Sequence, residues 1–122
     1  MRAREFISKL LPGGGLSRVL RYWDRLGIQH RVSELDDIIR VHEFVVPDDR
    51  RGSGVGSRAM RRLFDYADRV GYTVVLTPTH DLGASSLERL ERFYRDLGFV
   101  YNRGGDADPR FQDVMYREPS GL

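Results

Sequence analysis

Three alternating glycines, Gly52, Gly54 and Gly56, constrain this 122-residue chain more than any other feature. They follow an apolar run that ends at Val46 and precede a helical pattern that begins near Ser57. Because glycine has no Cβ, the backbone there can turn sharply and can lie close to a ligand. The helix that follows presents free backbone N–H groups and the positive end of its dipole. The loop therefore predicts an anion site, most naturally a phosphate site.

Two common phosphate-binding motifs do not fit this loop. A P-loop needs a lysine after its last glycine, but the only lysine in the chain is Lys9. A dinucleotide-binding loop needs a third glycine where Ser57 stands, and an acidic residue where Thr77 and Pro78 follow the next strand. Nearby arginines still favour a phosphorylated ligand, because guanidinium groups make charge-assisted bonds to phosphate. These are Arg50, Arg51, Arg58, Arg61 and Arg62.

Composition restricts the class of protein further. The length suits one hydrophobic core, and 40% hydrophobic with 31% charged residues argues against disorder. A net charge of only +2 gives a nucleic-acid binder little electrostatic basis, although arginines recur along one helix. The lack of cysteine removes a disulfide framework, a thiolate nucleophile and a cysteine-based metal site. Apolar runs are too short for a membrane span, so we expect a cytoplasmic domain with no metal, membrane or nucleic-acid partner.

Hydrophobic periodicity predicts one α/β domain in the order αα-ββ-α-β-α-ββ. The expected elements are helices over 3–11 and 16–26, a hairpin over 28–35 and 38–46, a helix ending at Gly71, a strand over 73–77, a helix near 87–97, and a hairpin over 99–103 and 112–117. The strand over 38–46 is expected to be central, and the strand over 73–77 to be buried on both faces. We expect Ser17 to cap its helix, and Ser85 with Glu88 to form a capping box.

Two sequence motifs, one before the helix that ends at Gly71 and one in the helix near 87–97, together resemble one protein family. The spacing Arg51-x-x-Gly54-x-Gly56 resembles the acyl-CoA pyrophosphate loop of the GCN5-related N-acetyltransferases (GNAT). The segment Phe93-Tyr94-Arg95-Asp96-Leu97-Gly98-Phe99 is similar to the LYxxLGF segment of that family's last helix. The resemblance covers roughly residues 38–118. It implies a single GNAT-like domain over 1–122, with a mixed central sheet, flanking helices and N-terminal strands that are shortened or absent. Residues 1–27 would form a helical N-terminal part.

The resemblance also implies acetyl-CoA as a co-substrate and direct transfer of its acetyl group to a primary amine in a ternary complex. The family holds the pantetheine arm with backbone groups at the end of the preceding strand, and the phosphates with the glycine loop. The implied cofactor-binding residues are Val45, Val46, Arg51, Gly52, Ser53, Gly54, Val55, Gly56, Ser57 and Arg58. One extra residue stands between Pro47 and Arg51 compared with the family pattern, which leaves the register of Val45 against Val46 open.

Tyr94 matches the tyrosine that acts as general acid in the family, and a phenol stays protonated at neutral pH. The general base is open between Glu43, His80, His42, Asp81 and a water relay. Adjacent strand residues face opposite ways, so His42 and Glu43 are not expected to share a substrate. Periodicity instead puts Glu43 on the face of Ile39, Val41 and Val45.

Other features leave the function partly open. Leu87 stands where the family usually has an asparagine, and a longer loop over 77–84 is the expected place for substrate selectivity. An alternative hypothesis for the function is a catalytically degenerate GNAT-like domain that acts through CoA or protein binding. The amine acceptor, a small molecule or a protein, is not identified by the sequence, and a homodimer is possible.

Overall fold

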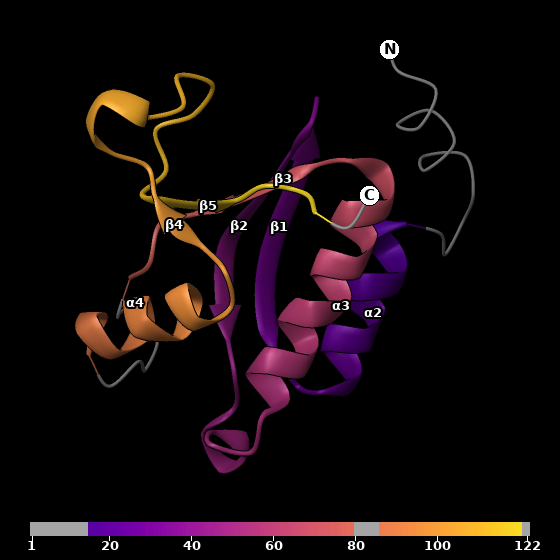
Figure 1. Ribbon diagram of the computed structural model, residues 1–122. Coiled ribbons are helices and arrows are strands. Elements are labelled where there is room, and N and C mark those ends of the chain that lie inside the picture. Colours follow the sequence, from indigo (N-terminus) through magenta and orange to yellow (C-terminus); the bar gives the residue numbers. More distant parts are fainter. Residues whose placement is uncertain (1–14, 80–85, 121–122) are drawn as a thin grey trace.

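Five strands form one mixed sheet in the order β1-β2-β3-β5-β4 in the computed structural model, which describes residues 15–79 and 86–120 (Figure 1). The strands are β1 (Gln29–Leu35), β2 (Ile38–Val45), β3 (Thr73–Leu76), β4 (Val100–Tyr101) and β5 (Met115–Arg117). The helices are α2 (Leu16–Arg25), α3 (Val55–Val70) and α4 (Leu87–Asp96), with 3-10 turns η1 (Asp48–Arg50) and η2 (Gly104–Asp106). This confirms the predicted α/β class and its mixed sheet with flanking helices. The helix expected over 3–11 lies outside the described residues.

The parallel pair β2–β3 lies inside the sheet, and antiparallel pairs flank it. β1 and β2 form the predicted hairpin, whose turn places Asp36 in the left-handed region at φ 57°. β3 pairs with β2 on one side and with β5 on the other. β2 is therefore an interior strand with a neighbour on each side, as expected, and β3 occupies the middle position of the sheet. All four residues of β3 are buried, as a strand covered on both faces requires.

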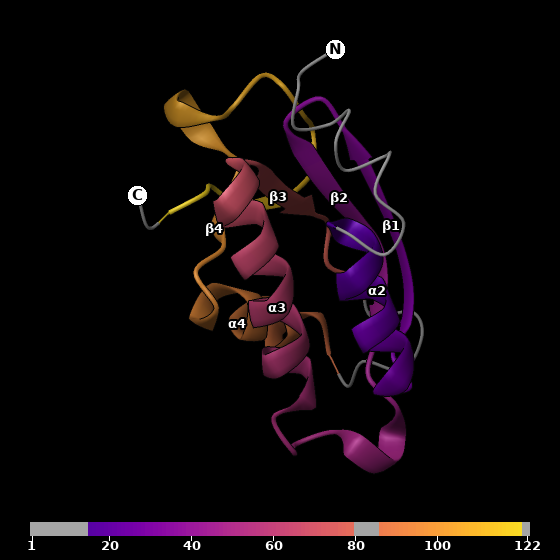
Figure 2. The same ribbon diagram turned by 90° about the vertical axis from the view of Figure 1, so that its right-hand side faces the viewer.

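Helices α2 and α3 lie side by side over the sheet (Figures 1 and 2). Trp23 of α2 is fully buried, and its indole N–H donates a hydrogen bond of 2.8 Å to the carbonyl oxygen of Ala59 on α3. The N-cap of α2 is Gly15, so Ser17 already lies in the first turn and the predicted Ser17 cap is wrong. The predicted end of α3 is confirmed, because Gly71 takes the left-handed conformation there at φ 77°.

The N-cap of helix α4 lies one residue later than predicted. The Ser86 hydroxyl accepts a 3.0 Å hydrogen bond from the Arg89 backbone N–H, which makes Ser86 the N-cap. Ser85 lies outside the described residues. Leu87 is 38% exposed, so the buried face of α4 is narrower than the predicted stripe and centres on Tyr94.

The final hairpin is confirmed but has much shorter strands than predicted. The Asn102 side chain explains why the chain leaves the ladder early, because its amide group organises the following loop. It donates to the carbonyl oxygens of Phe111 and Asp113 at 3.1 and 3.3 Å and accepts from the Asp108 N–H at 2.6 Å. Asp113 also binds Arg40 on β2, with Arg40 Nε 3.1 Å from its Oδ1. The loop is therefore fixed against the sheet.

The carboxylate of Asp68 on α3 ties the C-terminal segment to the core. Arg117 donates two hydrogen bonds to it at 2.9 and 3.2 Å, and the Ser120 backbone N–H donates another at 2.9 Å. Burial would raise the pKa of Asp68, but the bonds from Arg117 and Ser120 outweigh that effect and lower it. Charged Asp68 therefore stabilises the fold at neutral pH.

We expect Asp68→Asn to reduce the free energy of unfolding at pH 7 by about 1.5–3 kcal/mol, the usual contribution of a hydrogen bond to a charged group. Because the pKa of Asp68 is lower in the folded state, the stabilisation is fully present at pH values above the ordinary carboxyl pKa. It is lost as the pH falls through the pKa that Asp68 has in the folded state. Urea unfolding at pH 7 and at pH 3 measures this, with the exposed Asp65→Asn on the same helix as control. An Asp68→Asn deficit that is the same at both pH values would contradict the assignment.

Candidate functional site

A pocket of about 700 Å³ opens where β2 and β3 separate. The two strands pair only over Ile38–Val41 and Thr73–Leu76, and β2 continues beyond that point without β3 beside it. The second half of β2, the segment after β3, the glycine loop and α4 line the space. The pocket therefore adjoins both sequence motifs that resemble the GNAT family.

A β-bulge at His42 sets the direction of the side chains on this part of β2. Arg31 on β1 pairs with Glu43, but the next residue, Val32, pairs with Val41, so His42 is an extra residue. Val41 is buried in the core below. Phe44 packs on Trp23, with ring centroids 4.9 Å apart. Glu43 instead shares the opposite face with Arg31.

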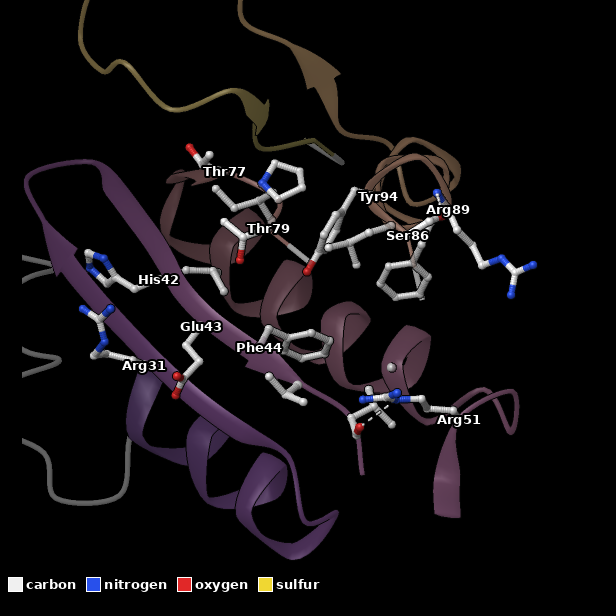
Figure 3. A pocket seen from close by; sticks show the side chains of 18 of the residues that line it. Arg31, His42, Glu43, Phe44, Arg51, Thr77, Thr79, Ser86, Arg89 and Tyr94 are labelled. Atoms are coloured by element: carbon white, nitrogen blue, oxygen red, sulfur yellow. Dashed lines mark hydrogen bonds between the residues drawn. The ribbon is translucent and has the colours of Figure 1, made fainter. Parts of the chain in front are cut away.

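The bulge overturns the predicted orientation of Glu43. A regular strand would have placed Glu43 beside Ile39 and Val41, with His42 on the other face. In the structure His42 and Glu43 both line the pocket, and Figure 3 shows them near Arg31 at one end of it. The expectation that these two residues would face opposite ways is therefore wrong.

His42 is held as a neutral imidazole. Its Nε2 lies 2.8 Å from the Ser33 hydroxyl oxygen on β1. Burial and then the positive charges of Arg31 and Arg40 lower the pKa of His42, and the nearby Asp113 carboxylate offsets this only in part. A neutral imidazole at physiological pH is able to accept a proton.

Tyr94 reaches the pocket from α4 (Figure 3). Its side chain is only 4% exposed and packs edge-on against Phe93 and Phe99, with ring centroids 5.2 and 5.5 Å away. Burial raises the pKa of Tyr94 well above its ordinary value. The phenol is therefore fixed in position and remains protonated, as a proton donor must be.

The glycine loop ends in an open helix N-terminus. Gly52 and Gly54 both take left-handed backbone conformations, at φ 80° and 85°, which confirms the need for glycine there. Gly54 is the N-cap of α3, and within residues 15–79 and 86–120 no side-chain hydrogen bond caps the start of the helix. Those donors are available to an anion.

Gly56 serves close packing. A Cβ at Gly56 would lie 3.2 Å from a methyl carbon of Val46 and 3.3 Å from the ring of Phe93. Because glycine has no Cβ, the start of α3 can pack directly against the end of β2 and against α4. This glycine joins the three elements that border the pocket.

Two side chains of the glycine loop, Arg51 and Ser53, bond to backbone or side-chain groups in and next to the loop. Arg51 donates a 3.2 Å hydrogen bond from Nε to the Val46 carbonyl oxygen, and its NH1 lies 2.9 Å from Asp48 Oδ1 (Figure 3). The Ser53 hydroxyl donates to the Arg50 carbonyl oxygen. Arg51 thus connects the loop with the end of β2, across the turn η1 that contains the extra residue after Pro47.

The structure brings most of the predicted site residues together. Glu43, Val45, Val46, Arg51, Gly52, Gly56 and Tyr94 all line the pocket. Ser53, Gly54, Val55, Ser57 and Arg58 belong to the adjoining loop and helix start, with Val55 buried. His80 and Asp81 lie outside the described residues, so their roles stay predictions.

Sequence reasoning did not single out several other residues of the pocket. Arg31, Thr77, Thr79, Ser86 and Arg89 all line it. They lie on three separate segments, namely β1, the segment after β3 and the start of α4, and no local motif marks them. Two signals could have been used. Thr77 and Thr79 belong to the loop that was expected to determine substrate selectivity, and the hairpin places Arg31 opposite the second half of β2.

The split sheet, the glycine loop at a helix start and the pocket between them are features of an acyltransferase domain. Residues 20–99 match the family model described as "Acetyltransferase (GNAT) family". This match covers more than half of the chain, so the protein belongs to the GNAT acetyltransferase family. No curated protein matches the chain significantly. Within 15–79 and 86–120, no helix is long and apolar enough to cross a membrane.

Solved structures of the same fold agree with this membership. The anti-CRISPR protein AcrVA5 is 25% identical, with a TM-score of 0.57 over 73% of this chain and 87% of that one. Ard1 from Thermoplasma volcanium is 24% identical, with a TM-score of 0.53 over 77% and 64%. A putative N-acetyltransferase from Lactobacillus plantarum is 18% identical, with a TM-score of 0.50 over 75% and 59%. The similarity to the last two proteins shows a shared fold only. This chain spans less than two thirds of the length of each of them.

Proposed function

We propose that the protein transfers the acetyl group of acetyl-CoA to a primary amine by direct attack in a ternary complex. The observation that carries the proposal is the position of the protonated Tyr94 in a pocket that adjoins an open helix N-terminus. The helix start would hold the CoA phosphates, and the pocket would hold the thioester and the amine. Membership of an acetyltransferase family supports the same reaction.

In the proposed reaction the neutral amine nitrogen attacks the thioester carbonyl carbon, and the C–S bond breaks. The Tyr94 hydroxyl gives its proton to the departing CoA thiolate. The proton lost by the attacking amine goes to a base in the pocket, directly or through water. Proton transfer by positioned groups of this kind contributes roughly 10²–10⁴-fold to a rate.

Two described residues are suited to receive that proton or to attract the amine. Glu43 supplies a negative charge in the pocket, which favours the approach of a positively charged ammonium group. His42 is neutral and lies beside it as a result of the bulge. His80, from the loop after β3, stays a third candidate. A cytoplasmic location and a homodimer likewise stay predictions.

Thermal unfolding with acetyl-CoA is the direct test of the donor site. At a concentration one hundred times Kd, a ligand that binds only the folded state adds about 2.7 kcal/mol of stability. For a domain of this size we expect Tm to rise by several degrees. A release of CoA thiol that depends on an added amine would separate an active enzyme from a domain that only binds CoA. A chain whose Tm does not respond to acetyl-CoA would refute the donor site.

Arg58 is the residue of the loop with the clearest predicted role toward phosphate. Its NH1 lies 3.7 Å from the Cβ position of Gly54, so the guanidinium group folds back over the glycine turn, and the side chain is exposed. We expect Arg58→Gln to weaken CoA binding about tenfold or more, the scale of a lost charge-assisted bond. Turnover at saturating acetyl-CoA should change little.

Calorimetric titration with CoA and with dephospho-CoA measures the effect of Arg58→Gln. Arg69→Gln near the other end of α3 is the matched control and should keep the affinity of the natural chain. Equal binding of the two ligands by all three proteins would exclude recognition of the 3′-phosphate by Arg58.

A further inference from the structure

Two opposite charges face each other across the hairpin at one end of the pocket. Arg31 on β1 and Glu43 on β2 are directly paired positions, and both line the pocket. Opposite charges at such cross-strand positions commonly attract each other. Here, among the described residues, neither side chain forms a salt bridge, and Figure 3 shows their charged ends turned to different sides. A guanidinium group and a carboxylate are both left for a ligand.

Other contacts fix the surroundings of this pair. The Ser33 hydroxyl bonds the neighbouring His42, and Asp113 is already bound by Arg40. Asp113 is therefore not the counterion of Arg31. The remaining charged residues of the pocket lining are also basic, namely Arg50, Arg51 and Arg89. An acceptor that carried only a positive amine would leave Arg31 without an anion in a pocket that is already rich in positive charge.

We infer that the acceptor is an α-amino acid whose carboxylate binds Arg31 and whose amino group lies at Glu43. The inference rests on the proposed function and specifies its substrate class. Guanidinium binds carboxylate in a planar, bidentate manner that an ammonium group does not reproduce. The amino and carboxylate groups of an α-amino acid sit on the same carbon. They can therefore bind together to two oppositely charged side chains that arise from directly paired strand positions.

The geometry also gives the amino group a route to reaction. It arrives as an ammonium ion attracted by Glu43 and must lose a proton before it attacks the thioester. The neutral His42 imidazole beside Glu43 accepts that proton, and the free amine then forms the new C–N bond as the C–S bond breaks. Arg31 takes no part in the chemistry and determines which amine is bound.

A comparison of free amino acids with their α-carboxamides tests the inference in the whole chain. The amides keep the side chain and the amine but lack the negative charge. CoA-thiol release should show, for at least one amino acid, a kcat/KM about tenfold or more above that of its amide. The amide contains the less basic amine, so it has more free amine at neutral pH, and a preference against it therefore reports binding of the carboxylate.

Arg31→Gln should remove this preference by raising KM for the amino acid, with little change in its kcat. Arg69→Gln, which removes an arginine of α3 outside the pocket, should retain it. Equal use of acids and amides by the natural chain would overturn the inference, as would acetylation of peptide N-termini but of no free amino acid. In both cases the proposed acetyl transfer would stand. A chain that neither binds acetyl-CoA nor releases its thiol with any amine would overturn both proposals.

Discussion

Tyr94→Phe should lower kcat by roughly 10²-fold or more while acetyl-CoA affinity and Tm barely change. The substitution keeps the ring that packs on Phe93 and Phe99, and removes only the hydroxyl proton. If Tyr94 protonates the departing thiolate, its contribution exists in the transition state and not in the ground state. The expected loss is the usual scale for the removal of a general acid.

Donors with different leaving groups sharpen this test. A thioester whose thiol is more acidic needs less help from an acid, so Tyr94→Phe should slow its reaction less. Tyr101→Phe is the matched control, because its hydroxyl bonds Glu91 and Tyr101 does not line the pocket. Full kcat together with a Tm several degrees lower would identify Tyr94 as a core residue only.

The pH profile gives the same hypothesis a second measurement. Burial raises the pKa of Tyr94, so its proton is retained throughout the alkaline range in which the protein can be assayed. We therefore expect no alkaline decline of kcat from this group. Because the pKa of His42 is lowered, a histidine base should lose activity at a lower pH than an ordinary histidine would.

Much of the fold could be predicted because local patterns determine it. Helix α3 has a regular apolar stripe and ends at Gly71, whose φ of 77° is costly for other residues. The turn at Asp36 and the buried strand β3 were equally visible in the sequence. The glycine loop was recognised for the same reason, because its conformation depends on residue type.

The details of the site depended on contacts that periodicity does not contain. The bulge at His42 arises from the pairing of β2 with β1, and it turns Glu43 from the core face to the pocket face. A period-two pattern assumes a regular strand, so it placed Glu43 wrongly. The loop before β5 is similar, since its shape depends on Asn102 bonding to residues up to eleven positions away.

Gly54→Val should abolish the Tm rise given by acetyl-CoA while leaving a folded protein. Gly54 has a φ of 85°, and apart from its chain neighbours the one described atom within 4 Å of its Cβ position is Arg58 NH1 at 3.7 Å. A side chain there would extend into the space in front of the helix N-terminus, where the proposed phosphates bind. Loss of the ligand would remove the whole linkage contribution, about 2.7 kcal/mol at one hundred times the original Kd.

Backbone strain must be separated from loss of the anion site, because a left-handed conformation costs a branched residue about 1–2 kcal/mol by itself. Gly104→Val provides the matched control. Gly104 has a φ of 80°, and apart from its chain neighbours no atom of the described residues lies within 4 Å of its Cβ position. It belongs to η2, which does not line the pocket. Both variants should melt lower than the natural chain, but only Gly104→Val should still be stabilised by acetyl-CoA. If Gly54→Val kept the full ligand shift, the phosphates would bind elsewhere, and the glycine loop would be a turn between β2 and α3 without a binding role.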